Sequence, residues 1–291
     1  VTEKRGAFKA WTVLLAILAF SLSLLGTFLV RSGVLSSVHA FATDPRRGLF
    51  ILGFLVVVVG ASLALFAWRA PKVGLGARFG ALSRESLLLA NNVLLVVAAG
   101  VVMLGTLYPL LLDALNLGKI SVGPPYFDTV FVPLMAPLVF LMGVGPAARW
   151  KQAELPDLVT RLRWAAGVAV AAAIATGWLA GRIGLMTTLG LVMAFWIVGS
   201  VVADLVSRVL PAGNGSGSVW RRLRLLPRAL VGMMVAHLGV AAFIFGVTMV
   251  RSYEIERDVK MNVGDTTQAQ GYTFTFRGAR DIEGPNYQAA Q

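Results

Sequence analysis

The sequence predicts an all-α polytopic integral membrane protein with about seven transmembrane helices, followed by the start of a small outer β-rich domain. Of its 291 residues 57% are hydrophobic, and the mean hydropathy is +0.76. Few soluble proteins hide that much apolar surface in one core. Several windows of about 20 residues carry no charge, which is the length that crosses a roughly 30 Å hydrocarbon layer.

Seven apolar segments are the expected spans of a helical domain over residues 1–250. They lie near 11–30, 49–68, 87–112, 130–145, 164–180, 183–206 and 229–250. The third is long enough to tilt or to protrude from the bilayer. The fourth is short and holds Pro133 and Pro137, so we expect it to be kinked or partly re-entrant.

The loop charges predict an orientation. The net charge is +12, from 26 basic and 14 acidic residues, and the cations cluster in residues 1–10 and in loops 69–86, 146–163 and 207–228. Loops rich in Lys and Arg face the cytoplasm, so the alternate loops and residues 251–291 are expected outside. Because the cations lie between spans, lipid is their expected partner, not nucleic acid.

Residues 251–291 change character and are expected to begin a β-domain that is truncated here. The run from Tyr272 to Phe276 alternates polar with apolar side chains, and turns are expected at Gly264-Asp265 and at Gly278. The chain opens on Val1 and stops inside this pattern. We therefore expect an internal fragment of a longer protein.

Loop 31–48, RSGVLSSVHAFATDPRRG, is an exception to the charge pattern. It carries Arg31, Arg46 and Arg47 on the side where cations are disfavoured, and attraction to an anionic ligand is one explanation. Arg31 is better explained by snorkelling from the end of the first span. For Arg46 and Arg47, pairing with ligand carboxylates and simple loop charge remain equal alternatives.

The chain holds two histidines, His39 in this loop and His237 in the last span, and no cysteine. An ionisable residue inside a span is costly and usually faces a partner or a cavity. Neutral imidazole is also the commonest axial ligand of haem iron. Composition alone favours the structural interpretation, a hydrogen bond between helices for His237 and a plain loop residue for His39.

No catalytic residues of a familiar kind are found. The sequence has no phosphate-binding glycine loop, no HExxH and no GxSxG motif, and it has no cysteine to act as a nucleophile. If the protein is an enzyme, its chemistry comes from a cofactor.

Five segments carry a resemblance to a known family: GTFLVRSGVLSSVHAFATDPRRG, ANNVLLVVAAGVVMLGTLYPL, VGPPYFDTVFVPLMAPL, GVGPAARWK and MVAHLGVAAFIFGVT. They resemble the CcmF/NrfE family, the large membrane subunits of the cytochrome c maturation haem lyase. The likeness runs from end to end of the chain.

The resemblance implies an enzyme subunit of the bacterial inner membrane whose functional face and C-terminal tail are periplasmic. It implies haem delivery by a haem chaperone and attachment to the CxxCH motif of apocytochrome c, together with other cytochrome c maturation subunits. His39 and His237 match family histidines and are expected to be the two axial ligands of one b-type haem in transit. Arg46 and Arg47 are expected to suit its propionates.

Two family features lie outside this sequence: the tryptophan-rich WWD segment, and the intramembrane histidines of a second, structural haem b. We expect both only in the full-length protein, and we expect the fragment alone to be inactive.

Two other functions remain as alternatives, a transmembrane transporter of haem or another solute and a non-catalytic scaffold. Transporters usually have inverted repeats and broken helices, and here only Pro133 and Pro137 hint at a break. Directional uptake into vesicles would favour a transporter, whereas retained haem that depends on both histidines would favour the lyase.

Overall fold

The computed structural model describes residues 1–33, 44–74, 76, 78–181, 184–210, 218–283 and 288–290. Seven of its helices are long and apolar enough to cross a membrane: α2 (Lys9–Ser32), α3 (Pro45–Val73), α4 (Arg84–Ala114), α5 (Pro124–Val144), α6 (Leu155–Leu179), α7 (Leu185–Val209) and α9 (Arg228–Tyr253). Shorter elements are α1 (Thr2–Arg5), the 3₁₀ turn η1 (Gly145–Ala147) and α8 (Val219–Arg224). The helical membrane fold that the sequence predicts is therefore confirmed.

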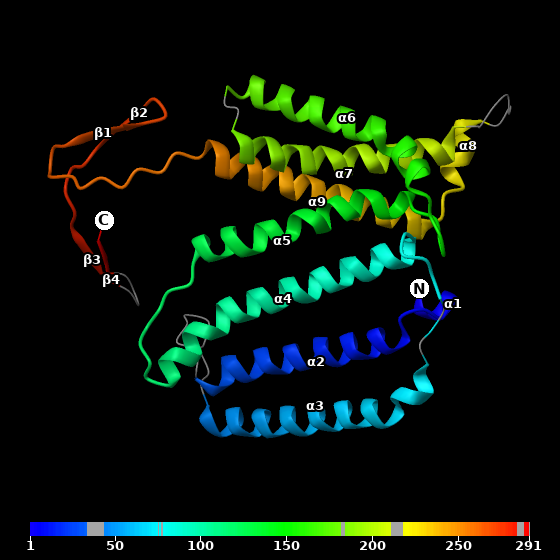
Figure 1. Cartoon of the computed structure of the whole chain (residues 1–291). Coiled ribbons are helices and arrows are strands. Elements are labelled where there is room, and N and C mark those ends of the chain that lie inside the picture. The colour runs from blue at the N-terminus through cyan, green and yellow to red at the C-terminus, as the bar shows by residue number, and fades with distance from the viewer. Residues whose placement is uncertain are drawn as a thin grey trace.

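The long helices lie side by side, from α6 at one edge of the molecule to α3 at the other (Figure 1). Successive helices run in opposite directions, so their ends form two rims. We call one the basic rim; it holds the starts of α2, α4, α6 and α9 and most of the lysines and arginines. The opposite rim holds the other helix ends, and there the chain passes into its β-strands (Figure 1).

Helix α7 forms the centre of the best-packed region, because α5, α6 and α9 all pack against it. Its Leu191 and Ile197 side chains are fully buried. Facing α7, helix α6 presents the small buried residues Ala165, Ala169 and Ala173. Small side chains let helix backbones approach closely, which is how helices associate in lipid, where the hydrophobic effect does not drive them together.

Helix α5 differs from the short fourth span that the sequence predicts, because it begins at Pro124 and runs unbroken to Val144. The Gly-Pro-Pro segment is the start of the helix, where a missing backbone N–H leaves no hydrogen bond unmade. Pro133 and Pro137 lie inside the helix and do not end it. A continuous helix of this length does not fit a partly re-entrant segment, whereas the expected kink at Pro133 or Pro137 stays a prediction.

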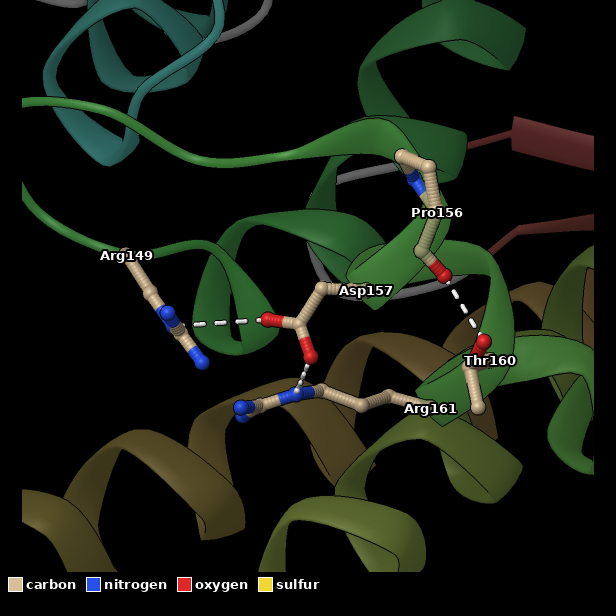
Figure 2. Close-up of polar contacts among 5 residues, drawn as sticks. All are labelled: Arg149, Pro156, Asp157, Thr160 and Arg161. Carbon is tan, nitrogen blue, oxygen red and sulfur yellow. Dashed lines mark hydrogen bonds and ion pairs between the residues drawn. The ribbon is translucent and has the colours of Figure 1, made fainter.

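Helix α6 begins at Leu155, nine residues before the predicted start of the fifth span. Pro156 and Asp157 lie in its first turn, which suits a residue without N–H and a negative charge beside the helix dipole. The Asp157 carboxylate forms an ion pair with Nε of Arg149 at 3.3 Å and accepts a hydrogen bond from Nε of Arg161 at 3.0 Å (Figure 2). Asp157 and Arg161, which interrupt the apolar run of the sequence, therefore lie in the first turns of α6, before its apolar part.

On the basic rim, the segment before α4 pairs with the loop after η1. Backbone hydrogen bonds run from Gly80 N to the Lys151 carbonyl at 2.7 Å and from Ala153 N to the Leu82 carbonyl at 2.7 Å. The Glu85 side chain, on a residue that is 4% exposed, accepts from Lys151 N at 2.8 Å. These bonds fix the start of α4 beside the loop that leads into α6.

After α9 the chain forms two antiparallel hairpins. Strand β1 (Thr266–Ala269) pairs with β2 (Tyr272–Thr275), and β3 (Asp281–Glu283) pairs with β4 (Gln288–Ala290). Gln270 and Gly271 connect the first pair with φ values of 48° and 83°, as a two-residue turn of a hairpin requires. The strand predicted from the alternation at Tyr272–Phe276 is confirmed.

Candidate functional site

The imidazole of His237 is held by its own helix. Its Nδ1 lies 2.8 Å from the main-chain carbonyl oxygen of Met233, one turn earlier in α9. A carbonyl only accepts, so Nδ1 carries the proton and donates it, which leaves the lone pair of the ring on Nε2. Histidines that bind metals commonly have this arrangement, with one ring nitrogen fixed by a carbonyl and the other left for the metal.

His237 is half-buried and lies deep within its helix. It follows Arg228 by nine residues and precedes Tyr253 by sixteen. At 1.5 Å per residue it lies about 14 Å from the basic rim and about 24 Å from the opposite rim, measured along the helix axis. The residues one turn before and after it on the same side, Met234 and Ala241, are buried against α7.

Arg46 and Arg47 lie at the opposite rim, in the first turn of α3. The Asp44 carboxylate caps this helix by accepting from Arg46 N at 3.1 Å and from Arg47 N at 3.3 Å. Asp44 also pairs with Nε of Arg47 at 3.2 Å, whereas Arg46 forms no ion pair within the described residues. Asp44 N donates to the Arg31 carbonyl at 3.0 Å, which brings Arg31 to the same place. A group of cations therefore gathers at this corner of the opposite rim.

The structure does not bring His237 and these arginines together. Helices α2 and α3 lie on one side of the molecule, and α9 lies with α7 toward the other (Figure 1). His39 lies in residues 34–43, outside the described residues. What the structure gives for its loop is the position of the two ends, Gly33 and Asp44, both at the opposite rim.

An ion pair at the opposite rim was missed in the sequence. The Arg251 guanidinium, at the end of α9, donates to the Asp128 carboxylate, in the first part of α5. Close by, Thr187 Oγ1 at the start of α7 donates to Ser252 Oγ at 2.9 Å. The predicted fourth span began at residue 130, which left Asp128 in a loop. A helix start placed at the Gly-Pro-Pro segment would have brought it level with Arg251.

Among the residues that the structure describes, no three His, Asp or Glu side chains gather as metal ligands would. An iron bound to this part of the chain would therefore depend on single ligands such as Nε2 of His237. The half-buried setting of that imidazole, within a largely apolar helix, fits one axial position of a haem.

Comparison with known proteins gives consistent results. Residues 252–291 match the family model described as the CcmF C-terminal beta-sandwich. The chain is 50% identical over 287 residues to the cytochrome c-type biogenesis protein CcmF of Pseudomonas aeruginosa, and the match covers 99% of this chain and 43% of that protein. It is 48% identical over 289 residues to CcmF of Escherichia coli strain K12, with the same coverage.

The chain belongs to the CcmF/NrfE family of cytochrome c biogenesis proteins. A more distant member, NrfE of Haemophilus influenzae, is 34% identical over 289 residues, and the match covers 44% of that protein. A solved structure of "Cytochrome c Heme Lyase CcmF" matches with a TM-score of 0.67 and 26% identity, covering 100% of this chain and 42% of that one. The chain thus spans about 43% of the length of the CcmF proteins of Pseudomonas aeruginosa and Escherichia coli.

Proposed function

We propose that this chain is the haem-handling part of a haem lyase membrane subunit that acts in cytochrome c maturation. Haem is its substrate, a haem chaperone delivers it, and apocytochrome c accepts it through a CxxCH motif, alongside other maturation subunits. The observation that carries this proposal is the 50% identity to a CcmF protein across 99% of the chain. We place the protein in the bacterial inner membrane with its opposite rim and β-strands in the periplasm, because loops rich in Lys and Arg stay in the cytoplasm.

The reaction adds two thiols to two vinyl groups. Each cysteine S–H of the apocytochrome adds across one vinyl C=C bond; sulfur bonds to one carbon and hydrogen to the other, so no atom is lost and no oxidant is consumed. This chain has no cysteine, so it offers no competing thiol. Its task in the proposal is to hold the haem while the thiols approach.

Two histidines and two arginines hold haem in this proposal. His237 gives an axial ligand through Nε2, because its Nδ1 already donates to the Met233 carbonyl. His39, which lies outside the described residues, would bind a haem iron as well. Arg46 and Arg47 face the propionates, because guanidinium groups pair well with carboxylates. Arg46 is the stronger candidate of the two, since Arg47 already pairs with Asp44.

The depth of His237 bears on whether both histidines bind one iron, as the family resemblance implies. Asp44 follows His39 by five positions, so the extended chain between them spans at most about 18 Å. His237 lies about 24 Å from the opposite rim along α9. The histidine side chains and the iron extend this reach. However, α3 and α9 are also separated sideways, with α2, α4 and α5 between them (Figure 1). We therefore propose that His39 and His237 bind two different haem irons. The second ligand of each iron comes from outside this chain.

The experiment uses the full-length protein with His39→Gly, His237→Gly or both, purified from cells that supply haem. Two irons predict that each single variant loses a different haem spectrum and that added imidazole restores only that one. A shared iron predicts that both single variants lose the same spectrum. Leu238→Gly controls for the cost of glycine in α9, because Leu238 is the exposed neighbour of His237. A double variant that keeps its haem and still matures cytochrome c contradicts the proposal.

A further inference from the structure

An apolar groove opens between α5 and α6, with α7 as its floor, in the half of the molecule next to the basic rim. Its volume is about 530 Å³. Leu158, Leu162 and Ala166 of α6 form one side, Phe140 and Val144 of α5 form the other, and other apolar residues complete it. The single charged residue in the lining is Arg163.

The volume limits what the groove holds. Sites for small ligands occupy about 300–1,000 Å³. The volume of the groove lies within this range, so the groove fits a ligand with one flexible chain.

The groove follows the first part of α6, and Arg163 lies near its middle. Along α6 its lining runs from Leu155 to Val170, about 22 Å at 1.5 Å per residue. Trp164 is 72% exposed within this stretch, and its ring lies 5.7 Å from the Arg163 guanidinium carbon. Exposed tryptophans concentrate at the membrane–water interface, so Arg163 lies at the level of the lipid headgroups.

The charge of Arg163 is available to an anion. Its neighbours Arg149 and Arg161 share the Asp157 carboxylate (Figure 2). Within the described part of the chain Arg163 forms no such pair, and the residue is exposed. A cation at headgroup level above an apolar groove complements a ligand with an anionic head and an apolar tail.

We propose that this groove binds one anionic phospholipid of the leaflet at the basic rim. The phosphate pairs with Arg163, and one acyl chain runs from there toward the middle of the membrane, along Ala166 and Val170 of α6 and Phe140 of α5. This lipid fills the space that α5 and α6 leave open above α7. The proposal concerns the structure of the membrane domain and does not depend on the haem sites.

The test compares lipids that remain bound to the full-length protein after detergent extraction, counted per protein by mass spectrometry. Arg163→Gln is expected to lower retained phosphatidylglycerol about fivefold, as expected when one cation facing an anionic headgroup is lost. Ala166→Phe fills the groove and is expected to lower it as well. The matched controls are Arg161→Gln, whose partner is Asp157, and Ala171→Phe, on the other side of α6, and both retain the lipid.

Equal retention by Arg163→Gln and the unaltered protein overturns the proposal, and so does an equal loss in Arg161→Gln. If Ala166→Phe fails to reach the membrane, the two arginine variants decide the question alone. Haem content is measured in the same samples, and we expect it to be the same in all of them.

Discussion

The indole Nε1 of Trp196, on α7, donates a hydrogen bond to the main-chain carbonyl of Phe140, on α5, at 3.0 Å. The Trp196 ring also stacks on the Phe140 ring, with centroids 5.5 Å apart and planes 10° from parallel. Gly143, one turn later in α5, gives this indole its space. A Cβ on Gly143 would lie 2.3 Å from Nε1 of Trp196.

Gly143→Ala should therefore destabilise the contact between α5 and α7. The added methyl group needs the indole to move, but the hydrogen bond and the stacking hold it, and overpacking of this kind typically costs about 1–3 kcal/mol. Thermal unfolding of the full-length protein in detergent measures the loss. Gly145→Ala is the matched control, since a Cβ there meets nothing within 4 Å. Equal unfolding midpoints for the two variants would refute this account of Gly143.

Glu85 gives a second prediction, at the basic rim. Glu85→Ala removes the acceptor of Lys151 N and with it a part-buried hydrogen bond, which should cost about 0.5–1.5 kcal/mol. Glu85→Gln keeps an oxygen there and should lose less. Glu154→Ala is the control, because Glu154 makes no capping bond with its side chain. Hydrogen exchange at residues 149–153 reports the effect, and unchanged exchange in Glu85→Ala would contradict it.

The Asp128–Arg251 pair should act locally and weakly. The two side chains are 52% and 54% exposed, so the pair contributes about 0.2–1 kcal/mol, and salt reduces it. A double-mutant cycle with Asp128→Asn and Arg251→Gln measures the coupling through hydrogen exchange in the last turn of α9. We expect each variant to show faster hydrogen exchange in the last turn of α9 and an unchanged global unfolding midpoint. A coupling that salt does not reduce would show that something other than solvent-exposed charge holds the two helices.

The two rims should differ in access from outside the cell. Cysteines introduced one at a time at Asn116 and at Gln152, in full-length protein otherwise free of cysteine, lie in exposed positions on the opposite and basic rims. An impermeant thiol reagent should label intact cells at Asn116 and should reach Gln152 after permeabilisation. The reverse pattern would invert the orientation that the loop charges predict.

Much of the fold follows from local sequence. Apolar length predicted the seven helices, and the alternation at Tyr272–Phe276 predicted a strand, because both signals lie within one element. The start of α5 was missed because the predicted span began at residue 130, although Pro124 and Pro125 can open a helix. The early start of α6 was missed because Asp157 and Arg161 interrupt its apolar run.

The candidate site was harder to predict, because it depends on contacts between distant segments. The sequence identified His237 as the imidazole inside a span, but its bond to Met233 and its distance from α3 needed the structure. The Asp128–Arg251 pair joins residues 123 positions apart, and no local pattern indicates such a pair. The sequence does not distinguish Arg163 from the other cations of its loop, because the groove that it lines is formed by residues from several helices.

The central position of α7 has a consequence for biogenesis. Helices α5 and α6 are synthesised first, and the small buried face of α6 has no partner until residues 185–209 leave the ribosome. In lipid, apolar side chains alone do not draw these helices together. A nascent chain that stops before residue 185 therefore inserts α6 without the helix that buries its small residues. Maturation of this membrane domain depends on the docking of one late helix, and α9 adds to it last.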